Sequence, residues 1–476
     1  MKTTDFVHLI VRETTMFICG FLAACMLIPA ANAQFGQGGG FGQGGFGGQF
    51  GGQGPGGGGG QFPGGIAISP EGVISHPQAQ RVNMKLAQKK MQEIAHQHLP
   101  GDLSMVSKLR KVSLNRLEAA CQEYVDAGKD IPTECWYLAG LTRIDYIVAD
   151  PVHGDLLLCG PAEPFAPWLN GRVIGTESGR PVITLDDLLV MFRLRSFNNT
   201  LGCSFDPDPQ RLAETNRVSN ANTAPVTPAV ARQNFHNLAR ILGNWNVTVF
   251  GLPKDSQAAL TTVEADYLLK RIALGIDRPR VRGFRSHLET VSLNDTSFSR
   301  WWFAPRYDVI ERSPDGNIFH ISGPRLQLMA QEELVDEAGN RSASPFEAVS
   351  VKKYTTQFNK HIEALCEQVP SFAGIQNLFD LAITAALIDA NRLTDRVGWT
   401  PRLFVDAKTL PTRRYVVPKE VPSMANTRAV NAGRMLALIG GGVTIRPAQM
   451  LSRTDVLAES DQPEVRRPED ASWWWD

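Results

Sequence analysis

A histidine and two carboxylates lie close together in one short stretch of this sequence. Asp150 and His153 lie within the turn-like run Asp-Pro-Val-His-Gly, and Asp155 directly follows it. A histidine beside two acids can transfer protons or bind a metal ion. Asp-Pro and Gly residues are also typical of an ordinary polar turn, and we favour the turn interpretation for this group.

A second pair of carboxylates, Asp186 and Asp187, could supply the acid and base of a hydrolase. Asp187 stands three residues after Thr184, where a capping box places an acid at a helix start. We therefore favour a structural role for this pair. Asp206 and Asp208 lie in an Asp-Pro repeat that predicts a turn more strongly than a cation site.

No sequence motif assigns a catalytic or cofactor role. The chain has no GxSxG elbow, HExxH helix or phosphate-binding loop. Catalytic residues thus stay unassigned, and we expect neither a cofactor nor a metal site. Lys plus Arg and Asp plus Glu are balanced at 48 each, which argues against nucleic acid as a partner.

Seven cysteines are present, two of them, Cys19 and Cys25, in the first 33 residues. An oxidising compartment permits disulfides, but no CxxC pair indicates a structural zinc site. Buried, reduced thiols are the simpler interpretation, and the sequence leaves the pairing open. The remaining five are Cys121, Cys135, Cys159, Cys203 and Cys366.

The first 33 residues are typical of a signal peptide. Residues 16–30 form an apolar run too short to span a bilayer, and Ala31 and Ala33 suit a signal peptidase, so Gln34 is the expected first mature residue. Cleavage before a lipid-modified Cys25 is the alternative, but the apolar run continues past it. The sequence predicts export to the periplasm, cell envelope or outside, with no transmembrane helix in the mature chain.

Composition and patterning divide the chain into segments. The predicted fold is α+β, in which alternating strands and helices form a central α/β layer with partly parallel strands, followed by a hairpin-plus-helix region. Residues 34–65 contain only Gly, Gln, Phe and Pro, a low-complexity composition that cannot form a core. The segments are a signal peptide (1–33), a disordered leash (34–75), a helical segment (76–135), the α/β region (136–299), the hairpin-plus-helix region (300–452) and a disordered acidic tail (453–476).

Several elements are predicted from apolar spacing and turn residues. The turn Ser313-Pro314-Asp315-Gly316, between residues 306–312 and 317–322, predicts a hairpin. Residues 372–393 are apolar nearly all round and predict a buried core helix. Asp266 and Lys270, four apart on a predicted helix, are interpreted as a surface ion pair. The aromatic run after Arg300 is interpreted as core packing. Trp473–Trp475 could dock on a partner or a lipid surface or fold back on the protein, and the sequence leaves this open.

Five short segments occur in an order that resembles an uncharacterised family of exported planctomycete proteins, a domain of unknown function (DUF1598). The likeness covers about residues 139–446 and implies bacterial export, but it implies no activity or site residues. The segments are Cys159-Gly160-Pro161-Ala162-Glu163, residues 179–189, Gly202-Cys203-Ser204-Phe205-Asp206-Pro207, residues 265–272 and Arg300-Trp301-Trp302-Phe303-Ala304-Pro305; residues 418–421 and 441–443 also fit.

Two functional hypotheses follow. The favoured one is a noncatalytic envelope or extracellular binding and structural protein whose partner is an envelope polymer or protein. The alternative is a secreted hydrolase whose acids come together only in the fold, drawn from Asp150, His153, Asp155, Asp186 and Asp187.

Overall fold

The computed structural model describes most of the chain beyond residue 65. The predicted signal peptide and the glycine-rich part of the leash lie outside the described residues. These are residues 66–69, 71–75, 84–168, 171–194, 200–221, 227–291, 298–336, 338–345, 348–424, 440–451, 454–464 and 473–476.

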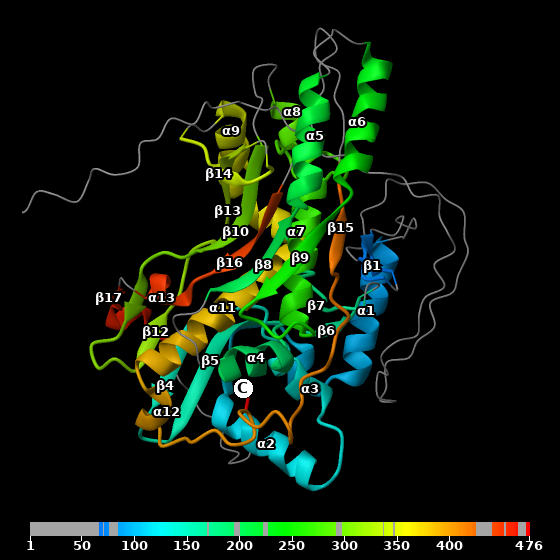
Figure 1. The fold of residues 1–476 in the computed structure, drawn as a ribbon. Coiled ribbons are helices and arrows are strands. Elements are labelled where there is room, and N and C mark those ends of the chain that lie inside the picture. Colours follow the sequence, from blue (N-terminus) through cyan, green and yellow to red (C-terminus); the bar gives the residue numbers. More distant parts are fainter. Residues whose placement is uncertain are drawn as a thin grey trace, which may run out of the picture.

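Two large mixed sheets organise the fold (Figure 1). In spatial order the seven-stranded sheet contains β14 (Arg341–Ala343), β13 (Arg325–Val335), β10 (Phe298–Arg306), β16 (Gly440–Ile445), β8 (Leu201–Asp206), β9 (Asn244–Phe250) and β15 (Glu420–Pro422). The six-stranded sheet contains β17 (Thr454–Val456), β11 (Ile310–Arg312), β12 (Ile318–His320), β4 (Tyr146–Asp150), β5 (Asp155–Ala162) and β3 (Ser107–Ser113).

Two small antiparallel pairs complete the strands: β1 (Ala67–Ile68) with β2 (Ile74–Ser75), and β6 (Phe165–Pro167) with β7 (Val173–Gly175). The longer helices are α1 (Met84–His98), α2 (Leu114–Asp126), α4 (Leu185–Leu194), α5 (Pro209–Ala221), α6 (Pro228–Leu242), α7 (Gln257–Ala273), α9 (Val349–Lys360) and α11 (Pro370–Ala390). The shorter ones are α3 (Thr133–Trp136), α8 (His287–Thr290), α10 (Ile362–Gln368), α12 (Leu393–Arg396) and α13 (Pro447–Met450).

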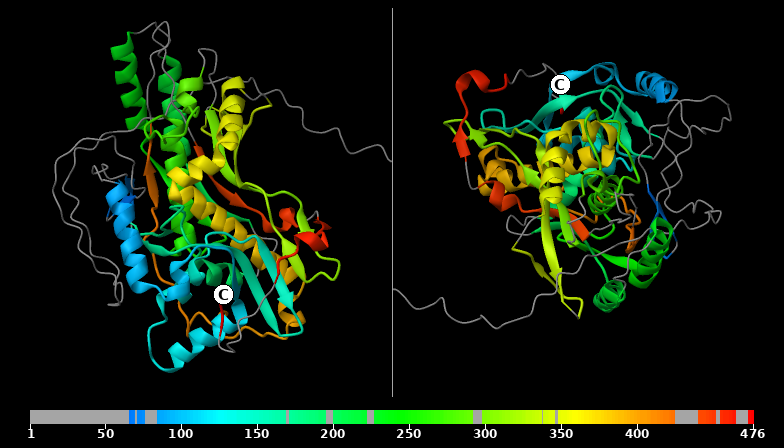
Figure 2. Two further views of the ribbon diagram at one scale, coloured as in Figure 1. Left: turned by 180° about the vertical axis from the view of Figure 1, so that it is seen from behind. Right: turned by 90° about the horizontal axis from the view of Figure 1, so that it is seen from above.

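Helix α11 runs through the centre of the molecule, between the two large sheets (Figures 1 and 2). Among the described residues it is the one helix long and apolar enough to cross a membrane, and 94% of its most apolar window is buried inside the protein. A helix that is apolar on all sides is stabilised most when protein surrounds it completely, because this removes the most apolar surface from water. The predicted buried core helix is confirmed.

Several helices begin where the sequence places a capping side chain. Ser113 accepts a hydrogen bond from the N–H of Arg116 at the start of α2, and Ser256 caps α7 in the same way. Thr227 caps α6, whose first residue is proline. These side chains satisfy backbone donors that the first helical turn leaves unpaired, so local sequence fixes where these helices begin.

The α+β fold class is confirmed, and the parallel strand pairs are β10 with β16 and β11 with β17. Both lie outside the predicted central layer, where β4 with β5 and β8 with β9 are antiparallel. Each large sheet takes strands from both sides of residue 300. The predicted boundary at that residue therefore does not separate structural units.

Two disorder predictions need correction where the structure describes the chain. Residues 67–75, placed in the leash, contain β1 and β2. In the tail, residues 454–456 form β17 beside β11, and residues 473–476 dock on β3. Composition argued for disorder in both places, but a few residues can be ordered by pairing with a strand formed elsewhere in the chain. The remaining part of the tail, residues 465–472, lies outside the described residues.

Candidate functional site

The first sequence-predicted group, at the β4–β5 turn, is not brought together as one site. His153 Nδ1 lies 2.9 Å from Asp150 Oδ2 at an exposed hairpin end. Asp155 is fully buried at the start of β5, where its Oδ1 accepts hydrogen bonds from the Arg116 guanidinium (2.8 Å) and the Ser113 hydroxyl (2.9 Å). Its carboxylate thus anchors the start of α2, separately from the Asp150–His153 pair.

The second group, Asp186 and Asp187, lies in the first turn of α4 with both side chains buried. The N–H of Asp187 donates to Thr184 Oγ1 (3.2 Å), and the Thr184 hydroxyl donates back to Asp187 Oδ2 (2.9 Å). The Gln257 amide donates to the same oxygen (3.0 Å). Burial raises the pKa of Asp187 to about 7. Asp186 Oδ1 accepts the N–H of Arg413 (2.9 Å).

The Asp187 arrangement resembles the predicted cap, and its carboxyl can change charge near neutral pH. Its Oδ1 has no hydrogen-bond partner among the described residues. Neither Asp186 nor Asp187 lines the pocket described below. The structure therefore places the pair inside the protein, where it supports the start of a helix.

The Asp266–Lys270 pair on α7 is buried, so the surface interpretation is wrong. The two side chains are 0% and 3% exposed and form an ion pair. Lys270 Nζ also lies 3.6 Å from the centre of the Phe205 ring. Helix α7 packs against β8 and β16 on one side and α11 on another, so it has little solvent-facing surface. Spacing four residues apart predicts the pairing but says nothing about burial.

Burial determines the protonation chemistry of this region. Burial lowers the pKa of Lys270, whereas the neighbouring Asp266 acts to raise it. Burial also raises the pKa of Asp266. It also raises the pKa of the Cys203 thiol to about 12, so this cysteine is a poor nucleophile. A cavity of about 10 Å³ beside Lys270 has room for about one water molecule. Among the described residues, this region is a packed interior.

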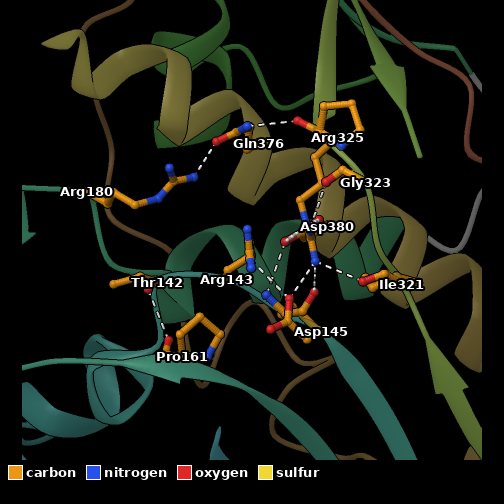
Figure 3. Close-up of polar contacts among 12 residues, drawn as sticks. Thr142, Arg143, Asp145, Pro161, Arg180, Ile321, Gly323, Arg325, Gln376 and Asp380 are labelled. Carbon is orange, nitrogen blue, oxygen red and sulfur yellow. Dashed lines mark hydrogen bonds and ion pairs between the residues drawn. The ribbon is translucent and has the colours of Figure 1, made fainter. Parts of the chain in front are cut away.

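A buried ionic network joins α11 to both sheets (Figure 3). Arg325 Nε donates to both oxygens of Asp380 (3.0 and 3.2 Å), and its Nη2 donates to Asp145 Oδ1 (2.6 Å). The Tyr307 hydroxyl and the N–H of Ile144 also donate to Asp380 (2.7 and 3.1 Å). Burial raises the pKa of Asp380, and Arg325 opposes that rise.

Both oxygens of the Asp380 carboxylate accept protein hydrogen bonds. Arg325 has a left-handed backbone (φ 59°), which is uncommon for a residue with a Cβ and is held here by these contacts. The network extends along α11 to Gln376, which receives a hydrogen bond from Arg180 and donates to the carbonyl of Pro324. We assign the network a structural role.

The best candidate for a functional site is a pocket at the end of α11, with a volume of about 260 Å³. Its floor is formed by small and apolar side chains of α4, β8, α11 and α13. Its rim carries hydroxyl and carboxylate groups from α11, α12 and the loop that follows. The lining residues are Met191, Phe192, Leu194, Leu201, Ala382, Ala385, Ala386, Ile388, Asp389, Thr394, Asp395, Trp399, Thr400, Pro401 and Pro447.

Hydrogen bonds hold the loop wall of this pocket in place. The Trp399 indole N–H donates to Glu118 Oε2 (2.7 Å), while Glu118 Oε1 accepts the backbone N–H groups of Arg402 and Phe404 (both 2.8 Å). Arg193 Nε donates to the carbonyl of Phe404 (2.7 Å). The aromatic wall is thus positioned before any ligand arrives, which lowers the entropic cost of binding.

The ring of Trp399 is also fixed by aromatic packing. Its centre lies 5.7 Å from that of Phe192 and 6.2 Å from that of Phe404, with the latter ring nearly perpendicular. Such edge-to-face contacts stabilise one ring orientation. The Trp side chain therefore forms a rigid wall of the pocket, while its polar atom is already bound to Glu118.

The charge on the pocket rim is negative. Asp389 and Asp395 are both exposed there, and the described lining residues include no Lys, Arg or His. Asp395 also pairs with Arg392 on the surface (2.7 Å). Thr394 and Thr400 add hydroxyl groups. The pocket thus offers apolar walls to the body of a ligand and carboxylate and hydroxyl oxygens to its donors.

Sequence reasoning did not identify this pocket. Its lining comes from residues 191–194, Leu201, residues 382–401 and Pro447, which only the fold brings together. A local signal was present in Gly398-Trp399-Thr400-Pro401, where a left-handed glycine (φ 65°) turns an aromatic side chain out of a helix end. Among the described residues, no group of three or more His, Cys, Asp or Glu side chains could hold a metal ion.

No curated protein and no solved structure matches this chain. The family comparison gives a match narrower than the resemblance seen in the sequence, and the pocket lies outside it. The matched segment does contain the buried Asp266–Lys270 pair and Cys203. Residues 203–287 match the family model described as Protein of unknown function (DUF1598), which agrees with the family that the sequence resembles.

Proposed function

We propose that this chain is an exported, noncatalytic binding protein of the cell envelope, and that the pocket at the end of α11 holds its ligand. The observation that carries the proposal is the rigid pocket, in which Trp399 is fixed by Glu118 and faces apolar side chains of α4 and α11. Ligand sites are typically apolar cavities with a few well-placed polar groups. The apolar signal-like run at residues 16–30 supports export.

The chemistry of the lining defines the ligand class. A volume of about 260 Å³ is below the roughly 300–1,000 Å³ typical of drug-sized sites, so the occupant is a small molecule or the end of a polymer. Two rim carboxylates favour an amine-bearing ligand, since the described lining residues include no cation, although Asp395 also pairs with Arg392. The apolar floor and Trp399 favour a compact body with an apolar face, such as a ring.

Binding by full-length mature protein tests this proposal with three probes. Cyclohexylmethylamine has an apolar ring and an amine, cyclohexylmethanol lacks the charge, and glucosamine has a sugar body with an amine. We expect both amines to bind saturably in calorimetric titrations, and the neutral alcohol to bind about fivefold more weakly than its amine analogue, as expected for an exposed ion pair. Equal affinity for amine and alcohol would contradict the proposed ligand class.

Incubation with fractionated cell envelope distinguishes binding from the hydrolase alternative. Saturable retention of the protein without soluble fragments supports a binding protein. Released fragments would instead support a hydrolase. None of the acids of the two predicted groups is among the described residues that line the pocket. Asp130→Asn, at an exposed position after the turn that follows α2 and outside the pocket, serves as the matched control for rim variants.

A further inference from the structure

Residues Trp473–Asp476, here called the WWWD segment, lie along the outer edge of strand β3. The N–H of Ser113 donates to the carbonyl of Trp474 (2.8 Å), and the N–H of Asp476 donates to the carbonyl of Lys111 (3.1 Å). Val112 and Trp475 form an antiparallel bridge. Because β3 is the last strand of the six-stranded sheet, these bonds satisfy backbone groups that an edge strand otherwise exposes.

Side chains make this contact specific. Asp476 accepts the N–H of Lys111 (2.8 Å) with one carboxylate oxygen and pairs with the Lys111 ammonium through the other. The guanidinium of Arg110 lies 5.1 Å from the centre of the Trp475 ring, and that of Arg116 lies 5.2 Å from the centre of the Trp473 ring. Cations at this distance from an indole face are attracted to it.

Trp473 also covers apolar side chains on the face of the sheet that is turned away from the main core. There it forms a separate cluster with Val148, Leu157 and Cys159. Trp474 and Trp475 pack instead against the main core. The WWWD segment therefore combines a backbone ladder, an ion pair and a large buried aromatic surface, which are the elements of strand-addition recognition.

We propose that the edge of β3, with Lys111, Arg110, Arg116 and the outer apolar cluster, is a recognition site for the Trp-Trp-Trp-Asp sequence, and that it accepts this segment from a second copy of the chain. The contacts described above join residues 473–476 to β3, α2 and the outer face. None of them requires the segment to belong to the same chain. A site filled in cis outcompetes a free segment because the linked one has a high effective concentration. Self-association then needs an empty site on one copy and a displaced segment on another.

A labelled peptide of residues 469–476 provides the first test. The acceptor is the mature chain stopped before Trp473, with circular dichroism showing whether its fold is retained. We expect saturable one-to-one binding in fluorescence anisotropy. The Asp476→Asn peptide should bind about tenfold more weakly because it loses the charge-assisted contact with Lys111. The complete chain, whose site is filled, should bind the peptide at least about tenfold more weakly than the shortened one.

A second test examines the partner. The shortened chain is mixed with a complete chain carrying Lys111→Gln, whose own site is weakened, and light scattering measures the mass. We expect a complex of two chains from the mixture and single chains from either component alone. Peptide binding without this complex would overturn the assignment of a second copy as partner. A folded acceptor that binds the peptide no better than a scrambled sequence would overturn the recognition site itself.

A cleavage variant covers the case in which the shortened chain does not fold. A protease site placed between Glu464 and Trp473 allows the folded protein to be cut after purification. The proposal expects the released fragment to stay bound through gel filtration and to be displaced by excess unlabelled peptide. Loss of the fragment at once, with no rebinding of added peptide, would contradict it.

Discussion

Asp380→Asn is expected to destabilise the protein strongly although it changes only one atom. The carboxylate is completely buried on α11 and accepts hydrogen bonds from Arg325, Tyr307 and the N–H of Ile144. An amide has one accepting oxygen, so its NH₂ group must face one of these donors. Removing one partner of a buried ion pair typically costs about 3–5 kcal/mol.

The lower end of that range is the better estimate, because Arg325 keeps its bonds to Asp145 and to the carbonyls of Ile144 and Ile321. We therefore expect a loss of about 3 kcal/mol in the free energy of unfolding. With a denaturant slope of about 3 kcal/mol per M, the urea midpoint falls by about 1 M. Equilibrium urea unfolding, followed by circular dichroism at constant slope, measures this shift.

Asp389→Asn on the same helix is the matched control. Its side chain is exposed at the pocket rim, and we expect a change within about 0.5 kcal/mol. The double variant Asp380→Leu with Arg325→Met should regain part of the loss, because it removes both buried charges together. The reasoning would be refuted by an Asp380→Asn variant that loses less than about 1 kcal/mol, or no more than the control.

Three further predictions concern other parts of the fold. Burial raises the pKa of Asp187 to about 7, so its contribution to stability is complete below about pH 4 and is lost as pH rises through 7, by at most about 1.4 kcal/mol per pH unit. The urea midpoints at pH 5 and pH 8 should therefore differ less in Asp187→Asn than in the wild type. An equal difference in the two proteins would contradict this prediction. Cys121 and Cys135 are free and buried in the structure, and a hydrogen bond with Cys121, together with burial, raises the pKa of the Cys135 thiol. Because the two thiols adjoin, an oxidising compartment would pair them despite the preference of the sequence for reduced thiols; in exported protein, mass spectrometry should find a disulfide worth about 3 kcal/mol for a loop of about 15 residues. Alkylation of both thiols without reduction would argue against the pairing or against export. Gly202 has φ 145°, and an added Cβ would lie 1.8 Å from the carbonyl oxygen of Val443. Gly202→Ala should therefore separate β8 from β16 and lower the free energy of unfolding by about 2–4 kcal/mol, an amount typical of a large core defect, with a corresponding fall in the urea midpoint. An unchanged midpoint would exclude this steric argument.

The sequence predicted elements whose signals are local. The apolar surface around residues 372–393 predicted α11, and the Ser-Pro-Asp-Gly turn predicted the β11–β12 hairpin. Trp301 and Phe303 are fully buried in β10, so the core-packing interpretation of that run is confirmed. In each case a side-chain pattern within one element determines the outcome.

What the sequence missed depends on contacts between distant segments. Strand β3 has little strand-like alternation, yet it pairs with β5 on one side and with the WWWD segment on the other. The i,i+4 spacing of Asp266 and Lys270 is the same on a surface helix and a buried one, and only the packing of α7 decides between them. Of the alternatives for the three tryptophans, the structure shows that they fold back onto the protein.

The pocket could not be predicted because no single segment defines it. Met191, Ala386 and Trp399 belong to α4, α11 and the loop after α12, and each has an ordinary local context. Glu118, which fixes Trp399, is one of several acids on α2, and its local sequence does not distinguish it from the others. Tertiary packing alone makes these residues one site.

The affinity of cyclohexylmethylamine for the full-length mature protein and for its Asp389→Asn/Asp395→Asn variant tests the central claim most directly. Calorimetric titration should show saturable one-to-one binding to the wild type and to Asp130→Asn. The double variant should bind at least about fivefold more weakly, and added salt should reduce that difference. Absence of saturable binding to the wild type, or equal affinity in the double variant, would contradict an amine-binding pocket at the end of α11.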